Sequence, residues 1–322
     1  MYGYDTFHDE LMKNLIESVH RQASSHAYIF EGEKGLGKLN SARLFAAALT
    51  CPNTDISPCG TCPSCIESKA NSNPDIIYVR PKKDKKSIGA DDMREIEEDV
   101  AIKPFNSKYK VYIFEDGMQL TEAAQNTFLK TFEEPPEYAV FIIVIENTAS
   151  LLQTIMSRCT LVHFPCVSDE IVEEYIREKY PEEKERLPFL VKYCGGVPKT
   201  ADNVINDEDF ETLRATSLEK LPSLLSSDRR FAFVIRKFLD ENKEKASLIL
   251  DFWLSFTRDT ILIQTGAMEK IINIDKKDNL RQVAASVNPE EVVRVSERLI
   301  QSEKMLGRYV SLKAISMWLA LR

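Results

Sequence analysis

A glycine-rich stretch between a short apolar run and a helix limits the folds open to this chain more than any other feature. Residues 32–39 read Gly-Glu-Lys-Gly-Leu-Gly-Lys-Leu. The apolar run before it, residues 26–30, has the length of a buried strand, and a helix is predicted to begin near Lys38. In this context glycines let backbone N–H groups surround phosphates at the N-terminus of a helix. The stretch therefore predicts a phosphate-binding loop (P-loop) in an α/β domain.

Four residues of this loop are candidates for nucleotide binding. Gly32, Gly35 and Gly37 would wrap the phosphates, and Lys38 would reach the outer ones. The next position normally carries a Ser or Thr hydroxyl on Mg²⁺, but here it is Leu39, and an alkyl chain cannot coordinate a hard cation. We therefore expect P-loop ancestry without hydrolysis. Binding of ATP or ADP stays open, Mg²⁺ is not expected, and a glycine turn without any ligand is the alternative.

The first half of the chain alternates strands with helices. Helices are predicted over residues 91–100 and 121–134, the second with Thr121 as N-cap and an apolar residue every fourth position. The predicted strands are residues 26–30, 76–79, 111–114, 140–145 and 161–164. Continuous apolar strands separated by helices predict a parallel sheet covered on both faces.

The second half of the chain is predicted to be helical. A helix is expected over residues 168–179, and helical patterns continue from about residue 210. The last helix, residues 310–321, is broadly apolar, so we expect it to be buried on several sides. A chain of 322 residues is long for a single core. We predict an α/β domain over residues 1–166, a small helical domain over 167–208 and an all-α domain over 209–322.

Four cysteines lie in one short segment and predict a metal site. Cys51, Cys59, Cys62 and Cys65 have the spacing Cys-x7-Cys-x2-Cys-x2-Cys. Cys-x2-Cys spacing lets two thiolates reach one ion, and four thiolates complete a closed tetrahedral zinc shell. We predict a structural zinc module over about residues 51–65, with an iron–sulfur cluster as the alternative. A closed shell leaves no position for a substrate water, so a catalytic role is not expected.

The other three cysteines lie elsewhere in the sequence. Cys159, Cys166 and Cys194 are expected to be buried apolar side chains. The polar N-terminus predicts no signal peptide, and the longest apolar run, residues 138–145, is strand-like and far too short to span a membrane. We therefore expect a cytoplasmic protein, in which seven cysteines argue against a disulfide framework.

The charge of the chain argues against direct binding to nucleic acid. The formal net charge is −8, so no global basic field attracts phosphate. The run Lys-Lys-Asp-Lys-Lys at residues 82–86 is expected to be a solvated loop, with a local phosphate contact as the alternative. Any contact with DNA would have to be local or shared with partner subunits.

Several motifs together resemble the AAA+ subunits of bacterial DNA polymerase III clamp loaders. They occur in the order seen in that family and cover roughly the first half of the chain. They are residues 26–30, the P-loop, the cysteine cluster, Leu-Lys-Thr-Phe-Glu-Glu-Pro-Pro at 129–136 and Ser-Arg-Cys at 157–159. The resemblance implies an AAA+ P-loop domain with a zinc-binding insert, a small helical lid domain and an all-α C-terminal collar domain.

The family contains two similar kinds of subunit, a stator and the gamma/tau ATPase motor, and the residues of the nucleotide site distinguish them. Motor subunits carry Asp-Glu at the end of the third strand, where this chain has Glu115-Asp116. A misplacement of about 1 Å there can cost on the order of a hundredfold in rate, although an acidic strand end facing solvent is the alternative. Lys199 stands where the motor has its second sensor arginine. Together with Leu39, these departures imply a subunit without its own ATPase.

The resemblance also implies a role and partners. Arg158 would act in trans as an arginine finger on the ATP of a neighbouring subunit. The chain would be a non-hydrolysing component of the polymerase holoenzyme, in a hetero-oligomeric ring with gamma/tau and delta subunits. Through that ring it would meet the sliding clamp and primed DNA. The alternatives are an active ATPase of gamma/tau type and a zinc-dependent DNA-binding protein.

Overall fold

The structure is a computed structural model, which describes residues 4, 6–226, 230–308 and 310–320, and all their side chains except those of 230–232 and 320. Most of the N-terminal stretch predicted to lack a signal peptide, and residue 321 of the last predicted helix, lie outside the described residues. The chain divides into two compact units, Met1–Ile171 with Val197–Lys199, and Val172–Gly196 with Thr200–Arg322. The predicted division into three domains after residues 166 and 208 stays a prediction.

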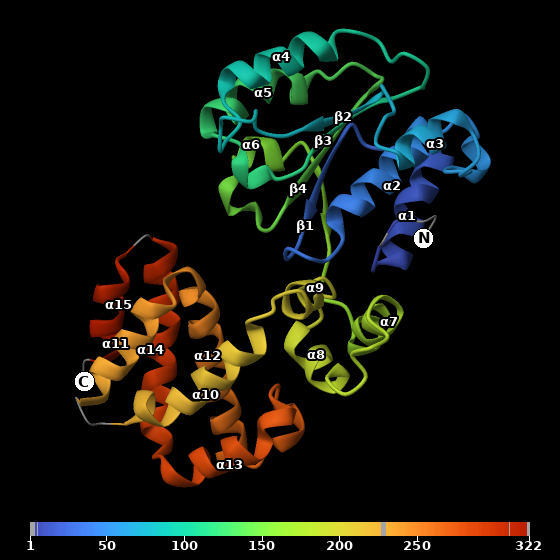
Figure 1. The fold of residues 1–322 in the computed structure, drawn as a ribbon. Coiled ribbons are helices and arrows are strands. Elements are labelled where there is room, and N and C mark those ends of the chain that lie inside the picture. Colours follow the sequence, from blue (N-terminus) through green and yellow to red (C-terminus); the bar gives the residue numbers. More distant parts are fainter. Residues whose placement is uncertain (1–3, 5, 227–229, 309, 321–322) are drawn as a thin grey trace. The chain divides into compact units, whose positions relative to one another are not determined.

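A five-stranded parallel sheet forms the centre of the first unit (Figure 1). The strands are arranged in the order β2-β3-β4-β1-β5. Their bounds are β1 Ala27–Glu31, β2 Ile76–Val79, β3 Lys110–Phe114, β4 Ala139–Ile145 and β5 Thr160–His163. All five predicted strands are confirmed, each within one residue of its predicted ends.

Helices cover both faces of this sheet, as the continuous apolar strands predict (Figure 1). One apolar cluster joins the sheet to α1 (Asp9–His20) and α2 (Lys38–Thr50). A second joins the opposite face to α4 (Ala90–Val100), α5 (Glu122–Glu133) and α6 (Gln153–Met156). Neighbouring residues of β4 alternate between the two clusters: Ile142 belongs to the first, Phe141 and Ile143 to the second.

The helix α5 begins where the sequence predicts. The Thr121 hydroxyl accepts a hydrogen bond from the Ala124 amide at 3.2 Å, which satisfies one of the free donors of the first turn. Ala124, Phe128 and Phe132 are buried on one side of the helix, as their four-residue spacing predicts. The remaining short elements of this unit are α3 (Pro63–Lys69) and the 3₁₀ turns η1 (Thr54–Ile56), η2 (Gly117–Gln119) and η3 (Thr148–Ser150).

The second unit is helical throughout its described part. Its α-helices are α7 (Asp169–Lys179, with its first turn in the first unit), α8 (Leu187–Cys194), α9 (Thr200–Ile205), α10 (Phe210–Leu225), α11 (Arg230–Glu241), α12 (Ala246–Gln264), α13 (Lys277–Ser286), α14 (Pro289–Gly307) and α15 (Leu312–Ala320). Three 3₁₀ turns, η4 (Lys243–Lys245), η5 (Met268–Lys270) and η6 (Ile274–Lys276), connect them. The predicted all-α second half is confirmed.

A fully buried arginine joins two parts of this helical unit. The Arg214 guanidinium lies 3.6 Å from the ring centroid of Phe189 on α8. It also donates to Asn273 at 2.8 Å and to Asp275 at 2.7 Å, so its charge is paired. Because Arg214 is fully buried while Asp275 is 35% exposed, loss of Asp275 would be the costly change, since it leaves a buried guanidinium without its paired carboxylate.

The last helix differs from its prediction. Ile315 and Leu319 are buried, but Met317 is 54% exposed and Trp318 is 40% exposed. The expectation of burial on several sides was wrong because α15 packs through one side against α11 and α14. No helix in the described part of the chain is long and apolar enough to cross a membrane.

Candidate functional site

The backbone of the glycine-rich loop has the shape that its sequence predicts. The loop leaves β1 and leads into α2, with Gly37 at the N-cap in the left-handed region at φ +76°. At Gly32 a side chain is excluded by space, because a Cβ atom would lie 2.4 Å from the Phe164 carbonyl oxygen. The structure thus brings Gly32, Gly35, Gly37 and Lys38 together in one turn at the start of a helix.

The lysine of this loop is held by the loop itself. Lys38 is 6% exposed, and its ammonium donates to the carbonyl oxygens of Gly32 at 2.5 Å and Glu33 at 2.6 Å. Burial lowers the pKa of Lys38, while nearby Glu146 and Asp116 act in the opposite direction. The ammonium is therefore bound to backbone oxygen inside the loop, and a phosphate would have to draw it away.

Leu39 takes part in the core rather than in a metal site. Its side chain is partly buried and packs against the apolar cluster between the sheet and helices α1 and α2. An apolar side chain in that position offers no oxygen to a cation. The position that would hold Mg²⁺ in an active P-loop protein is thus used for packing.

The acids at the end of β3 are already engaged by the protein. The Glu115 carboxylate accepts a hydrogen bond from Arg80 at 2.9 Å, and Arg43 lies 3.9 Å away. Asp116 caps η2 by accepting from the Met118 amide at 2.9 Å. Two guanidinium groups beside Glu115 oppose the approach of a divalent cation to this carboxylate.

The ion pair between Arg80 and Glu115 was not predicted from the sequence, although the register of the two strands indicates it. Val79 pairs with Phe114 in the parallel ladder between β2 and β3. The next residues, Arg80 and Glu115, leave these neighbouring strands at the same edge of the sheet. A correct pairing of the two strands would have indicated the ion pair.

The candidate arginine finger lies at the surface just after α6. The Arg158 side chain is 33% exposed, and its guanidinium pairs with Glu133, the last residue of α5, at 2.6 Å. It also donates to the Thr154 carbonyl oxygen at 2.7 Å. Both contacts hold the guanidinium in one orientation while leaving it accessible. The ion pair between Glu133 and Arg158 is a second contact that was not predicted from the sequence.

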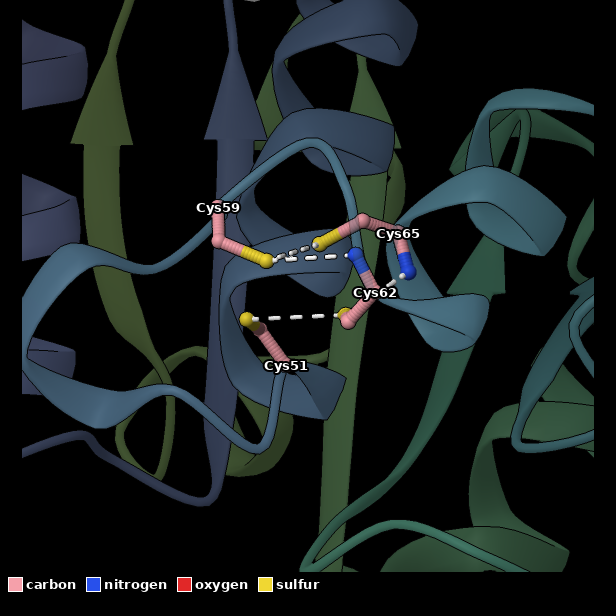
Figure 2. A group of neighbouring side chains, drawn as sticks. All are labelled: Cys51, Cys59, Cys62 and Cys65. Carbon is pink, nitrogen blue, oxygen red and sulfur yellow. Dashed lines mark hydrogen bonds between the residues drawn. The ribbon is translucent and has the colours of Figure 1, made fainter.

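The four cysteines of the predicted metal module converge on one point (Figure 2). Cys51 follows the last residue of α2, Cys62 is the N-cap of α3, and Cys59 and Cys65 lie on either side of that cap. The four sulfur atoms all lie within 4.8 Å of one another. The module is thus assembled from the C-terminus of one helix and the N-terminus of another.

The distances and environment of the sulfur atoms suit a tetrahedral metal ion. Cys51 and Cys62 sulfurs are 3.9 Å apart, and those of Cys59 and Cys65 are 4.0 Å apart. A tetrahedron with metal–sulfur bonds of about 2.3 Å has sulfur–sulfur edges of roughly 3.8 Å. Backbone amides donate to the Cys59 and Cys62 sulfurs at 3.4 Å each, as anionic thiolates require. The cluster can therefore hold a metal ion.

The thiols of this cluster differ in their surroundings. Hydrogen bonds from Thr61 and Cys62 lower the pKa of Cys59 to about 5, whereas burial raises the pKa values of Cys51 and Cys65. A bound cation would favour the thiolate form of every ligand and so oppose that burial effect. Without a cation, two buried thiols would face the cluster in their neutral form.

The three remaining cysteines only partly follow their prediction. Cys194 is buried, and Cys159 is partly buried against the apolar cluster of α4, α5 and α6. Cys166 is exposed, so the expectation of burial was wrong for that residue. It lies in the segment after β5, where the chain leaves the sheet and no longer contributes alternate residues to the core.

The parallel sheet, the P-loop without its metal ligand and the four-cysteine insert define an AAA+ protein of the clamp-loader type. Two family descriptions match the sequence: "DNA polymerase III, delta subunit" over residues 7–168, half of the chain, and "DNA polymerase III, delta subunit, C terminal" over residues 208–312. The chain belongs to this DNA polymerase III delta-subunit family.

Individual relatives include subunits of two kinds. The DNA polymerase III subunit delta' of Bacillus subtilis is 29% identical over 309 residues, which cover 95% of this chain and 92% of that protein. A gamma/tau subunit from Mycoplasma genitalium is 30% identical over 289 residues, 84% of this chain but 48% of that protein. The chain thus spans nearly all of the delta' relative and about half of the gamma/tau relative.

A solved structure gives a weaker comparison. The gamma subunit-related protein of Thermotoga maritima aligns over 91% of this chain and 99% of its own, with 21% identity and a TM-score of 0.42. At that score the superposition adds nothing to the family assignment, which rests on the sequence matches.

Proposed function

We propose that this chain is the non-hydrolysing delta' stator of a bacterial clamp loader and supplies Arg158 to the ATP site of a neighbouring subunit. The observation that carries the proposal is the state of its own P-loop. Lys38 binds the carbonyl oxygens of the loop, Leu39 packs into the core and Glu115 pairs with Arg80. A site in which the lysine, the metal position and the acid are all engaged elsewhere is poorly suited to hydrolysis.

The chemistry of the proposed finger follows from its surroundings. A guanidinium stays charged at all physiological pH values and can form two parallel hydrogen bonds to phosphoryl oxygens. In the ATP site of a neighbouring subunit, the Arg158 guanidinium would leave Glu133 and pair with the oxygens of the transferred phosphoryl group. There it would stabilise the negative charge that builds on that group. Because Glu133 is about half exposed, its carboxylate can be solvated when the arginine leaves. Glu133 acts as a positioning residue in this proposal.

The cysteine cluster is proposed to hold structural zinc. Zinc bound by four thiolates would tie the start of α3 to the end of α2 and thereby stabilise the segment between them. The residues involved are Cys51, Cys59, Cys62 and Cys65. A four-sulfur shell has no open position, so its contribution is to folding and not to a reaction.

The proposed partners are gamma/tau and delta subunits in a hetero-oligomeric ring, with the sliding clamp and primed DNA reached through that ring in the cytoplasm. The near full-length likeness to a delta' subunit favours this role over an active gamma/tau ATPase. The net charge of −8 disfavours the other alternative, a zinc-dependent DNA-binding protein.

The test is reconstitution from purified subunits. The full chain is mixed with the motor and delta subunits of the same organism, and ATP hydrolysis is measured with and without it. We expect the isolated chain to show no turnover with Mg²⁺ and the motor subunits to hydrolyse ATP faster when the chain is present. Turnover by the isolated chain that disappears in Lys38→Ala would instead establish an ATPase of motor type.

A further inference from the structure

The four cysteines of the metal module lie where the end of α2 meets the start of α3 (Figure 2). Cys51 directly follows the last residue of α2. Cys62 is the N-cap of α3, and Cys65 lies in its first turn. A shift of one helix end against the other would separate Cys51 from these two thiols. The contacts that join the helix ends therefore determine whether the ligands are in place before a metal binds.

A buried asparagine lies against both helices. Asn73, 6% exposed, belongs to the short connection between α3 and β2. Its side-chain nitrogen donates to the Ser64 hydroxyl oxygen at 2.9 Å and to the Ser68 hydroxyl oxygen at 3.0 Å, both on α3. The same nitrogen lies 3.5 Å from the hydroxyl oxygen of Thr50, the last residue of α2. The Asn73 side chain thus contacts both helices that supply the cysteines.

The orientation of this amide is fixed by its oxygen atom. The backbone N–H of Asp75 can only donate, and it lies 2.9 Å from the side-chain oxygen of Asn73. The side-chain nitrogen therefore faces the serines, and its two hydrogens match the two shortest contacts. The Ser64 hydroxyl in turn donates to the Thr50 carbonyl oxygen at 3.0 Å. A continuous hydrogen-bonded path thus runs from Asn73 through Ser64 to the residue that precedes Cys51.

The backbone around Asn73 is anchored to the sheet. The amide of Ile76, the first residue of β2, donates to the Asn73 carbonyl oxygen at 3.2 Å. The buried Asp75 carboxylate accepts hydrogen bonds at 2.5, 2.9 and 2.8 Å from three successive amides, those of residues 105–107, which begin with Phe105. The sheet and the loop before β3 therefore set the position of Asn73 without any contribution from the cysteines.

A buried side-chain amide can be purely structural, and this chain contains one for comparison. Gln125, 3% exposed on α5, donates to the Ser150 carbonyl oxygen at 2.9 Å and accepts from the Leu152 amide at 2.8 Å. It also joins separate segments, but α5 covers the opposite face of the sheet from α2. Asn73 differs from Gln125 because two of its partners directly precede metal ligands in the sequence.

We propose that Asn73 is a positioning residue of the metal module, which holds the ends of α2 and α3 where the four thiolates can share one ion. The inference rests on the proposed zinc site and assigns to it a residue that supplies no ligand. Groups outside the ligand shell that fix the orientation of ligands contribute about ten- to a hundredfold to metal affinity. Without Asn73, part of the binding free energy would be used to bring the thiols together.

The test measures the Kd of the full chain for Zn²⁺ under reducing conditions, by competition with a chromogenic chelator. Asn73→Ala removes the amide and leaves all four cysteines in place, so we expect its Kd to rise about ten- to a hundredfold. Ser64→Ala breaks the path to α2 at a partly exposed residue and should raise the Kd about fivefold, the scale of one neutral hydrogen bond. Gln125→Ala is the matched control, with an unchanged Kd.

Unfolding measurements separate positioning from general stability. Each variant is unfolded by denaturant with zinc bound and again after the metal has been removed. A residue that only stabilises the fold lowers the free energy of unfolding equally in both forms, as we expect for Gln125→Ala. For Asn73→Ala the loss should be larger with zinc bound, because the metal-free variant can relax and the zinc-bound one cannot.

The outcomes distinguish this inference from the proposed zinc site. If the unmodified chain binds zinc but Asn73→Ala binds it with the same Kd, the positioning role is refuted and the zinc site stands. An equal loss of affinity in Gln125→Ala would refute it as well. Should Asn73→Ala fail to fold, an unchanged Kd in Ser64→Ala would refute the path to α2. If the unmodified chain binds no metal, both proposals fail.

Discussion

The helix α2 has a candidate ligand site at each end, and the two candidate sites differ in the chemical groups that they offer. At its N-terminus the P-loop keeps the glycine backbone, but Leu39 packs into the core and Lys38 binds loop carbonyls. At its C-terminus Cys51 and three further cysteines keep every donor that a tetrahedral metal requires. The N-terminal end of α2 therefore keeps the backbone shape of a binding site without its ligand groups, whereas the C-terminal end keeps all four donor atoms.

The difference follows from which residues the fold itself requires. Gly32 and Gly37 also serve the fold, since one avoids the Phe164 carbonyl and the other begins α2. Nothing in the fold requires a hydroxyl at position 39 or a free acid at position 115. The cysteines, by contrast, would contribute to stability through the metal itself, so replacement of any one is expected to be costly.

The largest effect is expected at the cysteine cluster, which begins at the C-terminus of α2. Cys62→Ser should abolish stoichiometric zinc and lower the free energy of unfolding by more than about 4 kcal/mol, because the site loses its closed shell. Metal analysis and chemical denaturation of the purified chain measure both quantities. The exposed Cys166 lies outside the cluster, and Cys166→Ser is the matched control.

Two outcomes would contradict the metal site. Native protein that contains no zinc or other thiolate-bound metal would remove the proposed cofactor. Cys62→Ser with the stability of Cys166→Ser would show that the cluster contributes nothing to folding. In that case the contrast between the two ends of α2 would disappear.

The next largest effect is expected at Arg158. In the assembled loader, Arg158→Ala should slow hydrolysis at the site it completes by about a thousandfold, the usual value of an arginine finger in trans. In a rapid-quench experiment, the amount of ATP hydrolysed in the first turnover should then fall by the share that this site contributes. Arg177→Ala, which removes an exposed arginine paired within α7, is the control. An unchanged first turnover would remove the finger from the proposal.

A smaller effect is expected from repairing the P-loop. Leu39→Thr restores a metal-binding hydroxyl, but Glu115 would remain paired with Arg80. We expect the single variant to bind a fluorescent ATP analogue no better with Mg²⁺, and Leu39→Thr with Arg80→Ala to gain about tenfold in Mg²⁺-dependent affinity, the scale of one ion pair. A full gain in the single variant would show that Arg80 does not block the site.

The smallest effect is expected from Lys38→Ala in the assembled loader. If hydrolysis occurs only in neighbouring subunits, the ATPase rate should stay within about twofold, although the chain itself loses the hydrogen bonds to Gly32 and Glu33, worth on the order of 1–3 kcal/mol. Steady-state ATPase and thermal unfolding measure the two quantities separately. A collapse of the ATPase rate with intact assembly would show that this P-loop takes part in turnover.

Local patterns were enough to predict the strands, the start of α5 and the convergence of the four cysteines, while ligand binding at the P-loop and at the cysteine cluster stays a prediction. These predictions depend on residues close in sequence, and the structure confirms the strand bounds, the Thr121 cap and the approach of the four cysteine sulfurs to one another. The exposure of Cys166 and Trp318 was predicted wrongly, because burial depends on which neighbours cover a segment. Hydrophobic pattern alone does not identify those neighbours.

The sequence by itself determined that the P-loop lacks a hydroxyl metal ligand at Leu39 and that four thiols can share one ion. Only the tertiary structure decided that Arg80 neutralises Glu115, that Glu133 holds Arg158 and that Asp75 fixes the loop carrying Phe105. The physical reason is that each of these contacts joins residues at least 25 positions apart. Such pairs meet only after the strands have paired and the helices have packed on the sheet.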